Sequence, residues 1–167
     1  SIAVGTSMAR KECVSYSRGG WNSWQWNKDY LSKASSQPAR TLIISLGAND
    51  HKGVKTEQEL RKMREAVKAD RVFWIDPGQD RKPIPHDAIT RIAKEYGDTI
   101  LPRPKEHMSA DGIHPTGRGY KELAEKITQD ILDFINKTTL NFSSQNLIFI
   151  RYFVIPVSYT HLTLPTN

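Results

Sequence analysis

The chain has 167 residues and a mass of 19.0 kDa, which predicts one domain with at most a short tail. Its single cysteine, Cys13, excludes an internal disulfide and any multi-cysteine metal site. Basic residues are scattered despite the net charge of +6, so we expect no nucleic-acid partner, and no apolar run is long enough for a membrane span. We expect a soluble protein; secreted and periplasmic locations and the oligomeric state stay open.

Short apolar segments and helical periodicity alternate along the chain. The segments that predict strands are residues 2–4, 13–17, 41–46, 72–75 and 99–101. The segments that predict helices are residues 21–34, with Trp24 packed inside, then 56–67, 89–96 and 120–135. Thr56 and Glu59 have the spacing of a capping box, and Gly97 is a typical helix stop. This order predicts a three-layer α/β/α sandwich around a parallel five-stranded sheet.

The composition changes near residue 137. All 18 acidic residues lie between Glu12 and Asp133, and after Lys137 the only charged residue is Arg151. The last residues also resemble translated cloning sequence. We therefore predict a domain over residues 1–137 and a non-native or poorly ordered tail over 138–167, with an edge strand or a partner-binding tail as the alternative.

Polar and glycine-rich segments follow the predicted strands. They are Gly-Thr-Ser at 5–7, Arg-Gly-Gly-Trp at 18–21, Gly-Ala-Asn-Asp at 47–50 and Asp-Gly-Ile-His-Pro at 111–115. Ligands of parallel α/β sheets bind at the carboxyl ends of the strands, where these segments would meet. A serine needs a base such as histidine, a carboxylate orients that histidine, and amide N–H groups stabilise an oxyanion. Each segment alone is typical of a turn, but together they favour acyl transfer.

In this order the four segments resemble blocks I, II, III and V of the SGNH, or GDSL, hydrolases, over about residues 1–137. The resemblance implies a flavodoxin-like fold and hydrolysis of esters without a metal or cofactor. It implies that Ser7 is the nucleophile, His114 the base and Asp111 its partner. It also implies an oxyanion hole made by the backbone N–H groups of Ser7 and Gly20 and by the side chain of Asn49.

The sequence departs from the family pattern at three points. Thr6 stands where the family usually has an aspartate. Only twelve residues separate Ser7 from Gly20, so the first helix should be short or absent. Gly19 and Gly20 are adjacent, and we prefer Gly20 because residues 20–23 match a Gly-x-x-Ser variant of block II.

The expected substrates are short-chain carboxylic esters, including O-acetyl groups of carbohydrate or peptidoglycan. Trp21, Arg18 and His51 follow the site segments closely and are candidate substrate-binding residues, whereas His86 and His107 are expected to be surface histidines. Two alternatives stay open for the same fold. One is a non-catalytic carbohydrate-binding relative from a cell-surface or phage protein, and the other is a lysophospholipase or thioesterase. A phosphate-binding domain is disfavoured because no phosphate-binding glycine loop is present.

Overall fold

The computed structural model describes residues 13–139 and 152–155. Three neighbouring strands of its sheet are parallel: β2 (Ala39–Ile44), β3 (Ala69–Ile75) and β4 (Thr99–Leu101). Each connection between these strands contains a helix, as parallel pairing requires. The described chain is therefore a mixed α/β fold with four helices and a parallel three-stranded sheet, which confirms the predicted class.

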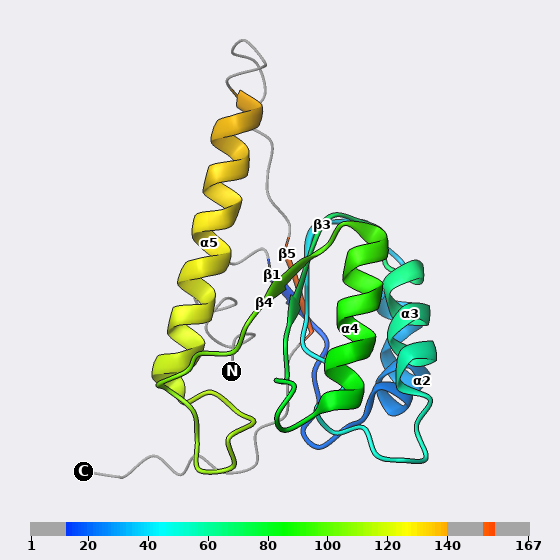
Figure 1. Cartoon of the computed structure of the whole chain (residues 1–167). Helices are drawn as coiled ribbons and strands as arrows, with labels where there is room; N and C mark the ends of the chain where they lie inside the picture. The colour runs from blue at the N-terminus through cyan, green and yellow to red at the C-terminus, as the bar shows by residue number, and fades with distance from the viewer. Residues whose placement is uncertain (1–12, 140–151, 156–167) are drawn as a thin grey trace, which may run out of the picture.

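Helices lie on both faces of the sheet (Figure 1). They are α2 (Ser23–Ala34), α3 (Thr56–Ala66), α4 (Pro83–Tyr96) and α5 (Gly117–Thr139). Leu42 and Ile44 of β2 belong to a core shared with α2, α3 and α4, while Ile43 belongs to a second core shared with α5. Successive strand side chains point to opposite faces, so an all-apolar strand contributes to both cores. No helix in the described part of the chain is both long and apolar enough to cross a membrane.

Two details of the helices differ from the prediction. The capping box is at the start of α2, where Asn22 and Gln25 bond reciprocally, and not at Thr56, because α3 begins without a side-chain cap. Glu59 instead accepts a hydrogen bond of 2.7 Å from Asn27 of α2, which fixes α3 against α2. Gly97 does end α4 in the left-handed conformation that glycine favours, as predicted.

Trp24 is not packed inside α2, as the sequence predicted, but is 51% exposed. The buried tryptophan of this helix is Trp26, which is 1% exposed and donates its indole N–H to the carbonyl of Tyr16 over 2.9 Å. Trp26 is thus buried with its one polar group satisfied by the backbone of Tyr16. The two positions lie about 200° apart around the helix, so only one of them can face the sheet.

Two further segments pair beyond β2. They are β1 (Cys13–Ser15) and β5 (Tyr152–Ile155), which extend the order to β1-β5-β2-β3-β4, with all pairs parallel. The five-stranded sheet of the prediction is not shown: its first strand, residues 2–4, lies outside the described residues, and Tyr152–Ile155 is the strand that pairs between β1 and β2. The domain boundary at Lys137 stays a prediction.

Candidate active site

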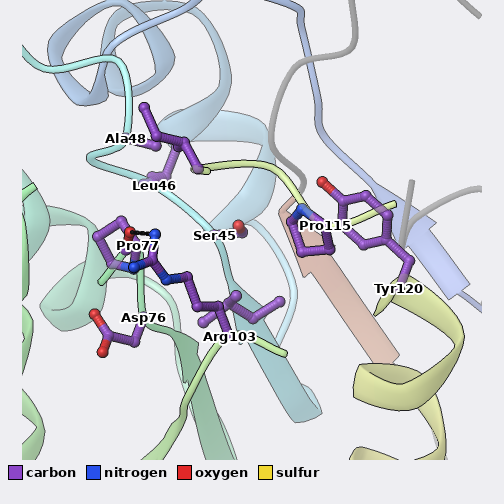
Figure 2. Close-up of a pocket in the computed structure, with 10 residues that line it drawn as sticks. Ser45, Leu46, Ala48, Asp76, Pro77, Arg103, Pro115 and Tyr120 are labelled. Atoms are coloured by element: carbon purple, nitrogen blue, oxygen red, sulfur yellow. Dashed lines mark hydrogen bonds between the residues drawn. The ribbon is translucent and has the colours of Figure 1, made fainter. Parts of the chain in front are cut away.

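A small cavity opens at the carboxyl ends of the parallel strands, as expected for a ligand site of an α/β sheet (Figure 2). It has a free volume of about 20 Å³, enough for about one water molecule. Its lining comes from the segments that follow β2, β3 and β4 and from the start of α5: Ser45, Leu46, Ala48, Ile75, Asp76, Pro77, Arg103, Ile113, Pro115 and Tyr120. The segment before Asn49 and the two neighbours of His114 therefore face one cavity.

The loop from Ser109 to Pro115, here called the His114 loop, is closed by hydrogen bonds among its own residues. Asp111 Oδ1 accepts the backbone N–H groups of Ile113 at 2.8 Å and of His114 at 3.0 Å. The Ser109 hydroxyl lies 2.7 Å from the same carboxylate oxygen and 2.6 Å from the carbonyl oxygen of His114. A three-residue spacing thus lets one aspartate hold the backbone that carries its own histidine.

The second oxygen of Asp111 binds the ring of His114. Asp111 Oδ2 and His114 Nδ1 are 2.5 Å apart, and His114 Nε2 is shielded from solvent. Burial raises the pKa of Asp111, but hydrogen bonds from the His114 ring, from two backbone N–H groups and from Ser109 outweigh it and hold the pKa well below its ordinary value. An ionised carboxylate can only accept, so the neutral ring carries its proton on Nδ1 and its lone pair on Nε2.

The segments around Gly20 and Asn49 are joined to each other, although they lie far apart in sequence. We call these contacts the Asp50–Ser23 junction. Asp50 accepts the backbone N–H of Ser23 at 2.7 Å and the Ser23 hydroxyl at 2.6 Å. The Asn49 side chain donates to the carbonyl of Trp21, the residue after Gly20, over 3.2 Å. This bond places the Asn49 amide beside the segment of Gly20.

Gly47 shapes the turn that carries Asn49. Its φ of 97° lies in a region that favours glycine, and a Cβ there would lie 2.9 Å from Pro85 Cβ at the start of α4. The same turn is closed by a hydrogen bond of 2.9 Å from the Asp50 N–H to the Gly47 carbonyl. This tight approach to α4 fixes where the Asn49 side chain leaves the sheet.

The structure describes some of the predicted site residues and not others. Ser7 and Thr6 lie outside the described residues. Gly20 is exposed in the turn before α2. His51 is also exposed, and its Nδ1 accepts the N–H of Gly53 at 3.1 Å, which directs the ring toward its own loop. Its role in substrate binding stays a prediction.

The two other candidate substrate residues contact each other. The guanidinium carbon of Arg18 lies 4.9 Å from the centre of the Trp21 ring, and Trp21 also packs against Tyr30 at 5.5 Å between ring centres. A cation over an aromatic face is a favourable arrangement, so Arg18 and Trp21 form one surface beside Gly20.

Sequence reasoning missed a second carboxylate–imidazole pair at this end of the sheet. Asp76, directly after β3, binds His86 Nδ1 at 2.9 Å and accepts the N–H of Gly78 at 2.8 Å. His107 likewise has a carboxylate partner, Glu122, at 3.1 Å. The available signal for the first pair was an aspartate at a strand end followed by Pro-Gly, the same kind of signal that singled out residues 47–50.

Comparison of the chain with protein-family models and with curated proteins found no match.

Proposed function

We propose that the protein is a serine ester hydrolase with a flavodoxin-like, three-layer fold and a five-stranded sheet. The observation that carries the proposal is the Asp111–His114 pair, joined at 2.5 Å beside a cavity at the carboxyl ends of the strands. An ionised carboxylate on Nδ1 leaves Nε2 as the base of the ring, which is the arrangement that activates a serine hydroxyl. Ser7 is the proposed nucleophile on the strength of its sequence context.

The proposed reaction proceeds through an acyl-enzyme. Ser7 Oγ attacks the ester carbonyl carbon while His114 Nε2 takes the hydroxyl proton, and Asp111 stabilises the imidazolium that forms. The tetrahedral intermediate collapses, its C–O bond to the alcohol breaks, and His114 gives the proton to the leaving alkoxide. Water then attacks the acyl-Ser7 ester with the same base, releasing the acid and restoring the serine.

The oxyanion of each tetrahedral intermediate needs fixed donors. The proposal assigns them to the backbone N–H groups of Ser7 and Gly20 and to the side chain of Asn49. The Asp50–Ser23 junction supports this role because it holds the segments of Gly20 and Asn49 together. Asn49→Ala should lower kcat by about 10²–10³-fold, as expected for the loss of one such donor.

Short acyl esters are the proposed substrates. The cavity beside the His114 loop is mostly lined by apolar side chains and holds only about one water molecule, so it offers no room for a long acyl chain. The Arg18–Trp21 surface beside Gly20 offers an aromatic ring to the alcohol part of the substrate, which favours a carbohydrate ester. Acetylated glycans are therefore the first natural substrates to test.

The test is hydrolysis of p-nitrophenyl acetate and butyrate, together with labelling by a fluorophosphonate probe. The native chain should hydrolyse both esters and be labelled at Ser7, and Ser7→Ala should abolish both signals with an unchanged circular dichroism spectrum. Ser32→Ala, on the exposed side of α2, is the matched control and should behave as the native chain. Turnover retained by Ser7→Ala would remove the assignment.

The same assay distinguishes the alternatives. Faster release of long-chain lysophospholipids or thioesters would redirect the substrate class while keeping the mechanism. Glycan binding without turnover of any ester, unaffected by His114→Ala, would make the protein a carbohydrate-binding module and not an enzyme.

A further inference from the structure

Arg103 joins the His114 loop to the end of β3. It follows β4, and its side chain is only 18% exposed although it carries a full charge. Its guanidinium donates to the carbonyl of Gly112, within the His114 loop, and to the carbonyl of Pro77, after β3, over 3.4 Å. The opposite side of the group forms an ion pair with Asp80. One cation therefore contacts two loops at the carboxyl edge of the sheet, and Figure 2 shows its bond to Pro77.

The path of this side chain depends on Gly78. A Cβ at that position would lie 2.6 Å from Arg103 Nε and would overlap the guanidinium carbon. A side chain at residue 78 would therefore displace the guanidinium from this place. Asp76 fixes the same loop by accepting the Gly78 N–H at 2.8 Å. The position of the guanidinium is thus defined from the β3 side as well as from the His114 loop.

The hydrogen bonds of Asp111 lie within the His114 loop, whereas the contact of Arg103 reaches the loop from outside it. Those bonds, to Ile113, Ser109 and His114, keep the loop in shape but do not place it relative to the strands. The contact from Arg103 to Gly112 lies between Asp111 and His114 in sequence. It therefore acts where a small displacement would turn the imidazole away from its substrate.

We propose that Arg103 is a positioning residue, which holds the His114 loop at the distance from the sheet that the reaction needs. The inference rests on the proposed function, because it concerns the placement of the proposed base. The rigid, planar guanidinium suits this task, since it can donate to two carbonyl groups and a carboxylate at once in fixed directions. Arg103 touches no reacting atom in this scheme and acts only through His114.

The first experiment compares Arg103→Met and Arg103→Lys in the full chain. Arg103→Met should lower kcat by about 10²-fold, the effect expected when a catalytic group moves by about 1 Å. KM should change less than kcat, because Arg103 lines the cavity but is proposed to act mainly through the placement of His114. Arg103→Lys keeps the charge but loses the fork of donors and should recover part of kcat. Arg61→Met, which breaks a surface ion pair between α3 and α4, is the matched control and should leave kcat unchanged.

A spectroscopic measurement makes the test independent of turnover. The Ile113 side chain lines the cavity together with Leu46, so its methyl chemical shifts report where the loop lies relative to the end of β2. These shifts should change in Arg103→Met, whereas the Nδ1–H tautomer of His114 should persist because Asp111 belongs to the same loop. If the native chain hydrolyses no ester, the proposed function fails, yet the Ile113 shifts still decide whether Arg103 holds the loop. Native Ile113 shifts and native kcat in Arg103→Met would overturn the proposal.

A second variant covers the case in which Arg103→Met does not fold. Gly78→Ala keeps the arginine but fills the space under its guanidinium. It should reproduce the loss of kcat and the change in the Ile113 shifts, whereas Gly97→Ala, at a glycine that also has a positive φ but meets no neighbouring atom, should change neither. Native behaviour of a folded Gly78→Ala would contradict the proposed path of Arg103.

Discussion

The two sides of the candidate site are held by different kinds of contact. In the His114 loop, the bonds of Asp111 connect residues at most three positions apart. At the Asp50–Ser23 junction, the partners are 27 positions apart and belong to different layers of the fold. The loop can therefore form its carboxylate–imidazole pair from local sequence, whereas the junction exists only once α2 has packed against the end of β2.

The contacts of the His114 loop are expected to matter for activity, and those of the Asp50–Ser23 junction for the stability of the fold. The bonds of Asp111 lie at an exposed edge, where a lost contact is replaced by water. The bonds of Asp50 satisfy Ser23, which is fully buried and has no access to water. A change in the loop should therefore reduce activity and leave the fold intact, while a change at the junction should destabilise the fold itself.

The largest expected effect is on catalysis. Asp111→Asn replaces the carboxylate by an amide that can donate to Nδ1 and so favour the wrong tautomer of His114, and kcat should fall by about 10³–10⁴-fold. Thermal unfolding should shift little, because the side chain is 45% exposed. Asp87→Asn, an exposed change on α4, is the control. A large loss of stability in Asp111→Asn would break the comparison.

The next effect is on stability. Asp50→Ala removes both partners of Ser23 and leaves a buried N–H and hydroxyl unsatisfied, which should lower the free energy of unfolding by about 2–3 kcal/mol. Urea denaturation followed by tryptophan fluorescence measures this change. Asp29→Ala, at an exposed position of α2, should stay within about 0.5 kcal/mol of the native chain. Equal stability of the two variants would show that the junction is not what holds α2.

A smaller effect is the pH dependence of the loop. Hydrogen bonds lower the pKa of Asp111 in the folded state despite the opposing effect of burial. The ionised carboxylate therefore stabilises the fold above about pH 4, its ordinary unfolded pKa, and this contribution is lost as the pH falls from there through the folded-state pKa. The native chain and Asp111→Asn should thus converge in urea midpoint as the pH is lowered. A constant difference would show that the carboxylate adds nothing to stability.

The smallest expected effect concerns the tail. Ending the chain after Asn141 removes Tyr152–Ile155 from its place between β1 and β2. Cooperative unfolding and ester hydrolysis should stay intact, because residues 2–4 are predicted to be a strand and we expect them to take that place. Tyr152–Ile155 pairs beside β1, the strand that leads to Gly20, and on the far side of the sheet from β4 and the His114 loop. Loss of cooperative unfolding on truncation would show that the fold depends on the tail at this position of the sheet.

Several elements could be predicted because their signals are local. The apolar run at 41–46 predicted β2, and residues 99–101 predicted β4 with the same bounds that the structure shows. The expected capping box at Thr56 was wrong because Glu59 has a partner on another helix, a contact that residue spacing does not reveal. Trp24 was wrongly predicted to be the packed tryptophan in place of Trp26, because the face of α2 that meets the sheet is decided by tertiary packing.

By itself, the sequence determined the class of the fold and the pairing of Asp111 with His114, because apolar periodicity and a three-residue turn are properties of short segments. Only the tertiary structure decided the contact of Asp50 with Ser23, the pair of Asp76 with His86 and the reach of Arg103 to Gly112. Each of these joins segments that follow different strands or helices. Such segments meet only when the strands align in parallel and the helices cover them, and no spacing along the chain encodes that meeting point.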